Sequence, residues 1–170
     1  MKLLKYIIIT FSGIFILMSC EKNRDTSPGV SELEHHYYAI FVPNNNTGVT
    51  VSRSQSALLK LPVQFYSIYT RDYDAVAKYA VTTSGITPPA VRGVDYNIVD
   101  KNGITIPSAD TTYSMVFPKA VQAMDTIYVK LLNNTAPGVR KFEIQMLDNI
   151  TTQFDVDIFS TAYRRPVQIN

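Results

Sequence analysis

The chain has 170 residues, of which 46% are hydrophobic and 18% are charged, so it is long and apolar enough to form a core and wholesale disorder is excluded. Its net charge of +2 comes from Lys2 and Lys5, because 14 basic residues balance 14 acidic ones from Cys20 onward. A neutral surface predicts no nucleic-acid partner. The single cysteine excludes an internal disulfide and a cysteine-based zinc site.

Residues 1–19 have the pattern of a secretory signal peptide. Two lysines precede an apolar run at 7–18, which is too short to span a bilayer, since spanning takes roughly 20 residues. The run ends in Leu-Met-Ser-Cys at 17–20, which resembles the lipobox of bacterial lipoproteins. The resemblance implies cleavage before Cys20 and acylation of its thiol, and two or three acyl chains anchor a protein stably to a membrane. An ordinary signal peptide or an uncleaved anchor is the alternative.

Residues 20–36 are polar, contain proline and glycine, and show no apolar periodicity, so we expect a flexible tether there. His35 and His36 close this segment. Neighbours in an extended chain point to opposite faces, so the two imidazoles would not converge on one metal, and we expect both to be exposed. The mature protein is expected to be an outer membrane lipoprotein, periplasmic or surface-exposed.

Residues 37–170 show the period of β-strands in segment after segment. The alternation is strongest at 59–65, 126–131, 141–146 and 154–158. Pro62 within the first of these predicts an edge strand or a bulge. Weaker strands are expected at 38–42, 48–53, 75–81, 94–98, 104–106, 113–117 and 165–169. Turn-forming residues separate them, which predicts an all-β, antiparallel, immunoglobulin-like sandwich of about eight to nine strands.

Two consecutive segments, Gly-Val-Asp-Tyr-Asn-Ile at 93–98 and Gly-Ile-Thr-Ile-Pro-Ser-Ala-Asp at 103–110, resemble the Calx-beta repeat. The resemblance covers 92–149, and sandwich domains of this kind also occur in Bacteroides-group lipoproteins of unknown function. Some Calx-beta domains bind calcium through acidic loop residues, and Asp95 and Asp148 are weak candidates for that role. However, 52–56 has no acid where that family commonly has one, and 139–141 is basic where the family is often acidic. Because calcium needs several oxygen ligands with net negative charge, no metal or cofactor is predicted.

Four tyrosines, Tyr66, Tyr69, Tyr73 and Tyr79, bracket the segment 67–74. Tyrosine combines a flat apolar face with a polar tip, which suits contact with a glycan or a protein, so these four are the candidate ligand-binding residues. The alternative is that they simply line strands, where tyrosine is common.

No catalytic arrangement is recognisable, and the chain is not expected to be an enzyme. Asp155 and Asp157 would project from one strand face about 7 Å apart, a separation within the range of an inverting glycosidase pair. Catalytic carboxylates face each other across a cleft, however, and two on one strand usually belong to a solvated face. Neither histidine lies near a nucleophile motif. Thr112 and Thr126 follow aspartates in short sequences that resemble the O-glycosylation sequons of exported Bacteroides-group proteins.

The sequence therefore predicts a non-catalytic binding or accessory module of the cell envelope, with membrane attachment through the lipid on Cys20 and a glycan or an envelope protein as ligand. The alternative is a structural surface or pilus-like subunit. In that reading residues 164–170 form a strand that is either donated to a neighbouring subunit or paired within the chain.

Overall fold

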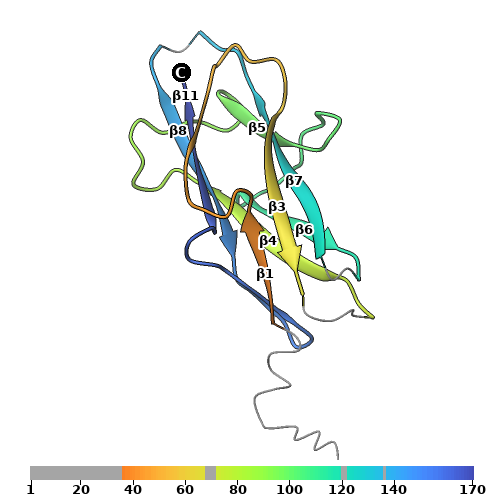
Figure 1. Ribbon diagram of the computed structural model, residues 1–170. Helices are drawn as coiled ribbons and strands as arrows, with labels where there is room; N and C mark the ends of the chain where they lie inside the picture. Colours follow the sequence, from red (N-terminus) through yellow and green to blue (C-terminus); the bar gives the residue numbers. More distant parts are fainter. Residues whose placement is uncertain (1–35, 68–71, 120–121, 136) are drawn as a thin grey trace, which may run out of the picture. The chain divides into compact units, whose positions relative to one another are not determined.

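A computed structural model describes residues 36–67, 72–119, 122–135 and 137–170. The predicted signal peptide, Cys20 and all of the predicted tether except His36 lie outside these residues. The described part contains no helix, and therefore none long and apolar enough to cross a membrane. It contains eleven strands (Figure 1): β1 His36–Phe41, β2 Val49–Val51, β3 Leu59–Tyr66, β4 Ala75–Thr82, β5 Tyr96–Val99, β6 Thr112–Phe117, β7 Gln122–Leu131, β8 Arg140–Leu147, β9 Asn149–Ile150, β10 Asp155–Asp157 and β11 Arg164–Ile169.

The strands form two sheets. Sheet A has the order β5-β7-β3-β1-β10-β9, and sheet B has the order β2-β11-β8-β4-β6. The predicted all-β sandwich is thus confirmed, although eleven strands form instead of eight to nine. Strands β2 and β10 lie within predicted segments but are only three residues long, and β9 has no predicted counterpart. The predicted strand at 104–106 is reduced to one bridge between Val99 and Thr105.

Most neighbouring strands are antiparallel, as expected, but two pairs are parallel: β1 with β10, and β2 with β11. Their cause is the path of the chain. It crosses from sheet A to sheet B between β1 and β2, and again between β10 and β11. The two connections run alongside each other in the same direction. As a result β1 lies parallel to β10 in sheet A, and β2 lies parallel to β11 in sheet B.

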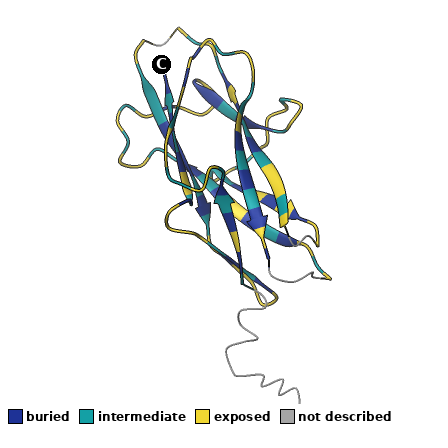
Figure 2. Cartoon of the chain, in the orientation of Figure 1, coloured by how far each residue is buried: buried dark blue, intermediate teal, exposed yellow. Residues whose placement is uncertain are grey.

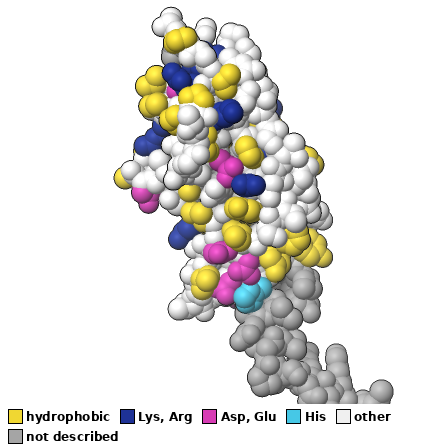
Figure 3. All heavy atoms as spheres, turned by 90° about the vertical axis from the view of Figure 1, so that its left-hand side faces the viewer, with side chains coloured by type: hydrophobic (Ala, Val, Ile, Leu, Met, Phe, Trp, Pro, Cys, Tyr) yellow, Lys and Arg dark blue, Asp and Glu magenta, His cyan; other side chains and the backbone are white. Residues whose placement is uncertain are grey.

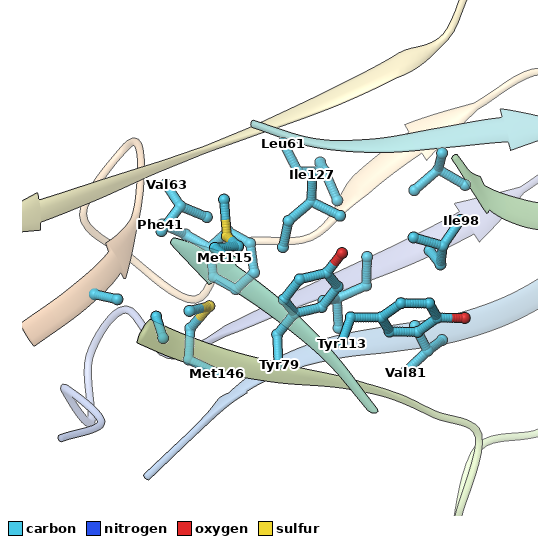
Figure 4. Packing of buried hydrophobic residues seen from close by; sticks show 14 of the residues in the cluster. Phe41, Leu61, Val63, Tyr79, Val81, Ile98, Tyr113, Met115, Ile127 and Met146 are labelled. Atoms are coloured by element: carbon cyan, nitrogen blue, oxygen red, sulfur yellow. The ribbon is translucent and has the colours of Figure 1, made fainter. Parts of the chain in front are cut away.

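The core lies between the sheets and follows the alternation of the strands (Figure 2). Every second residue of β3 and β4 is buried. Leu61, Val63 and Ile127 of sheet A face residues of sheet B that include Met115 and Met146 (Figure 4). Aromatic rings join the layers: the Phe65 and Phe117 ring centroids lie 4.6 Å apart, and those of Tyr96 and Phe142 lie 4.1 Å apart.

Pro62 lies in a central strand, because β3 pairs with β7 on one side and β1 on the other. The expectation of an edge strand or bulge is therefore wrong for β3 as a whole. The proline is tolerated within β3 because β1 ends at Phe41, opposite Val63. The Pro62 carbonyl accepts the last bond on that side, from the Val42 N–H, so no partner strand requires the N–H that proline lacks.

The crossing between β1 and β2 is held by a buried arginine of β11. Arg165 occupies an inward position of its strand and is 3% exposed. Its guanidinium donates to Asn45 Oδ1 and to the carbonyls of Pro43 and Thr47, and it lies 5.1 Å from the ring centroid of Phe41. Burial lowers the pKa of Arg165. The loop that carries these oxygens is thereby fixed to β11.

Candidate functional site

Asp95, a candidate calcium ligand, is buried in an ion pair and lies just before β5. Its Oδ1 is 2.8 Å from Nη1 of Arg53, and its Oδ2 accepts the N–H of Val91. Arg53 also donates to Asn134 Oδ1 and to the carbonyl of Gly138. A guanidinium thus fills the centre of this group of oxygens, where a bound cation would have to lie.

Asp148, the second candidate, lies elsewhere. It is exposed and follows the end of β8, where its Oδ1 accepts the N–H of Ile158. The Arg53 cluster lies beside Gly138, just before β8 begins, so the length of β8 separates the two carboxylates, about 26 Å by strand geometry. Asp95 and Asp148 therefore cannot share a cation. Among the described residues, no group of three or more His, Cys, Asp or Glu side chains has the geometry of a metal site.

The Arg53–Asp95 pair should make the stability of the protein depend on pH in the acid range. Burial raises the pKa of Asp95, but the hydrogen bonds from Asn134, Val91 and Arg53 outweigh burial and leave the pKa below its usual value. The folded form therefore binds fewer protons, and the stabilisation is present above the unfolded pKa of about 3.9 and is lost as the pH falls through the folded pKa. Urea unfolding at a series of pH values below about 4 should show this loss, and Asp95→Asn should flatten it. An equally steep loss in Asp95→Asn would contradict the assignment.

The four candidate tyrosines do not form one patch. Tyr66 is 52% exposed on the outer face of sheet A, whereas Tyr79 is 3% exposed and stacks on Tyr113 inside the sandwich. Tyr73 stacks on Phe154, and its hydroxyl hydrogen-bonds to that of Tyr37 at 2.6 Å. Tyr69 lies outside the described residues. Spacing along the chain could not reveal that Tyr66 occupies an outward position of one sheet and Tyr79 an inward position of the other.

Tyr79 instead belongs to the wall of a hollow at the side of the sandwich. The hollow has a volume of about 350 Å³, and Asp125, Thr126 and Tyr128 of β7 also line it. Burial, followed by the influence of Tyr113 and Asp125, raises the pKa of the Tyr79 hydroxyl well above its usual value. The Tyr79 hydroxyl therefore stays neutral, and the side chain is part of the hydrophobic core.

The outer face of sheet A carries an exposed aromatic surface, which we call the tyrosine face. Tyr38 of β1 lies directly opposite Tyr66 of β3, so their side chains share the face. The ring of Phe159, just after β10, contacts Tyr38 edge-on at 5.7 Å between centroids. In the next row Gln64 lies opposite Met124, which is also exposed. The tyrosine face comprises Tyr38, Gln64, Tyr66, Met124 and Phe159.

A histidine between two carboxylates borders the tyrosine face. His36 Nδ1 lies 3.0 Å from Asp157 Oδ2, and its Nε2 lies 3.4 Å from Asp155 Oδ2. Figure 3 shows the histidine beside acidic side chains, with hydrophobic side chains next to them. His36 is half-buried rather than exposed as expected, because the parallel pairing of β1 with β10 brings it beside Asp155 and Asp157.

Asp155 and Asp157 are not arranged as a hydrolytic pair. The two carboxylates flank one imidazole on an open sheet face, rather than facing each other across a cleft. Flat rings beside carboxylates and amides offer apolar stacking together with hydrogen-bond acceptors and donors. Tyr38 and Phe159 were not among the residues predicted from the sequence, since the spacing along the chain gives no sign that β1, β3 and the end of β10 are neighbours.

Thr112 and Thr126 lie in different local settings. The N–H of each donates to the preceding sequon aspartate, Asp110 or Asp125, and both threonines are half-buried. Thr112 begins β6, and Thr126 lies within β7. Their glycosylation stays a prediction.

No protein-family profile matches the chain, and no curated protein matches it either. Solved structures do resemble it. The Calx CBD2 domain is 12% identical with a TM-score of 0.50 and covers 78% of this chain and 85% of its own. The apo-form Calx CBD1 domain is 12% identical with a TM-score of 0.49, covering 79% and 97%. A type III cohesin module from the cell-surface anchoring scaffoldin ScaE of Ruminococcus flavefaciens is 9% identical with a TM-score of 0.45, covering 82% and 90%.

The fold is a Calx-beta-like, immunoglobulin-like sandwich. At 12% identity, the likeness to the Calx CBD2 domain shows a shared fold alone.

Proposed function

We propose that this protein is a lipid-anchored, non-catalytic module of the bacterial cell envelope that binds glycans through the tyrosine face. The leader pattern and the Leu-Met-Ser-Cys motif support export and anchoring at Cys20. The observation that carries the binding function is the exposure of Tyr38, Tyr66 and Phe159 on one sheet face, at 42%, 52% and 41%.

A glycan is the ligand whose chemistry fits this face. The C–H groups on one side of a pyranose ring stack on aromatic rings, and its hydroxyls need hydrogen-bond partners around them. Gln64 supplies amide groups within the face, and Asp155 and Asp157 supply carboxylate oxygens at its border. An apolar protein partner would gain little from the amide of Gln64 within the face and the two carboxylates at its border, whereas the hydroxyls of a glycan can use both.

The strand-exchange alternative receives no support from β11. Its residues 164–169 pair with β8 on one side, and 167–169 pair with β2 on the other. Val167 and Ile169 are fully buried in the core. Donating this strand to another subunit would expose core residues and break both ladders.

Binding is tested with the full chain in detergent by affinity electrophoresis against a panel of envelope and dietary polysaccharides. We expect at least one polysaccharide to retard the protein, and Tyr38→Ala and Tyr66→Ala each to weaken binding about tenfold, which corresponds to about 1.4 kcal/mol. Val116→Ala is the matched control, because Val116 is also 52% exposed but belongs to sheet B. Absence of any glycan binding, including the case in which only a protein partner binds, would contradict the proposal.

The anchor has a separate test, by membrane fractionation and intact mass of the natively expressed protein. Wild-type protein should fractionate with membranes and have the mass of a chain cut before Cys20 and acylated there, whereas Cys20→Ala should lose both properties. A soluble wild-type protein cut elsewhere would refute the anchor and leave the glycan test unaffected.

A further inference from the structure

The outer face of sheet B contains a hollow of about 400 Å³, away from the tyrosine face. Its floor consists of β8 and β11, and the residues before and within β2 form one side. The other side is the chain after β4, which leaves the sheet at Thr82, passes through Ile86 and returns to pair with Lys141. The volume falls within the range of small-molecule sites.

Two opposite charges line this hollow without pairing with each other. Lys141 and Glu143 lie two residues apart on β8, so their side chains share one face. No ion pair joins them, and among the described residues no acidic side chain lies within 4.0 Å of the Lys141 ammonium. Each of the two charges is therefore available to bind an oppositely charged group of a ligand.

Glu143 retains unused hydrogen-bonding capacity although it is buried. The residue is 8% exposed, and one carboxylate oxygen accepts a bond from Gln145 Nε2. Its other oxygen is 3.9 Å from Arg164 Nη1, beyond hydrogen-bond distance, and the Arg164 side chain is itself half exposed. A carboxylate has about four acceptor positions, so several remain for a donor within the hollow.

We propose that this hollow binds a small zwitterion with an apolar side chain, such as a free α-amino acid. The ligand ammonium would bind Glu143, and its carboxylate would bind Lys141. Ile86 and Pro166 supply the apolar walls against which its side chain packs. The site does not depend on the glycan function, because it lies on the opposite sheet.

The test compares leucine with two molecules that each lack one of its charges, by calorimetric titration of the full chain in detergent. 3-Methylbutylamine keeps the ammonium, and 4-methylpentanoate keeps the carboxylate. We expect leucine to bind at least about tenfold more tightly than either molecule, since each loses one charged contact.

Variants locate the binding. Glu143→Gln and Lys141→Met should each weaken leucine binding by at least about tenfold, whereas Lys78→Met, an exposed lysine facing outward from β4 of the same sheet, should leave it unchanged. Failure of wild-type protein to bind leucine would overturn the proposal. Leucine binding that survives either charge-removing variant would overturn it as well, because a zwitterion site needs both groups. Thermal unfolding of each variant confirms that it is folded.

Discussion

Arg53→Ala should lower the free energy of unfolding by about 3–5 kcal/mol, because it leaves a buried carboxylate without its cation. The Asp95 side chain is 2% exposed and that of Arg53 10%. The side chain of Arg53 also connects three segments of the chain by hydrogen bonds: its own loop at 52–54, the residue Asp95, and the stretch from Asn134 to Gly138. Its removal therefore leaves an unpaired charge and also releases the loops at this end of the sandwich.

Urea unfolding of the full chain in detergent, followed by circular dichroism, measures this loss. Arg164→Ala is the matched control, since Arg164 is a half-exposed arginine whose nearest carboxylate, that of Glu143, is 3.9 Å away, and its loss should change stability by less than about 1 kcal/mol. Arg53→Lys should recover only part of the stability, because an ammonium lacks the planar fork that reaches both Asp95 and Gly138. Equal stabilities for Arg53→Ala and Arg164→Ala would contradict this role.

Phe65→Ala should lower the free energy of unfolding by a similar amount, about 3–5 kcal/mol, through loss of buried area and creation of a cavity. Phe65 has no exposed surface, and its ring stacks on Phe117 of sheet B and contacts Tyr37 at 5.5 Å between centroids. The ring thus joins the two sheets within the core, where it has no exposed surface.

The neighbouring residue provides the control for Phe65. Tyr66 follows Phe65 directly in β3 and faces outward. Tyr66→Ala should therefore change the free energy of unfolding by less than about 1 kcal/mol in the same urea experiment. This variant also shows that a loss of glycan binding by Tyr66→Ala does not come from unfolding. A large loss of stability in Tyr66→Ala would contradict the assignment of its side chain to the surface.

Much of the sandwich was predictable because burial on one face imposes an alternation that can be read along a strand. The segments 59–65 and 141–146 correspond to β3 and β8, each with its alternating apolar residues inward as expected, and 113–117 corresponds to β6. Strand β9 was not predicted because two residues are too short to show alternation. Pro62 was wrongly expected in an edge strand or a bulge, because alternation does not specify how many neighbours a strand has or where their pairing ends. Alternation assigns a residue to a face but not a strand to its neighbour.

The alternating pattern and the leader motif are local properties, so the amino-acid order alone could determine the all-β class and the inward residues of the main strands, and could predict the Cys20 anchor. The tertiary structure decided which residues meet. Arg53 and Asp95 are 42 positions apart, and His36 and Asp157 are 121 apart. The tyrosine face joins β1, β3, β7 and the end of β10, and the zwitterion site needs the return of the chain after β4. Such contacts depend on strand order and register, which are set by the packing of the whole sandwich and by no local pattern.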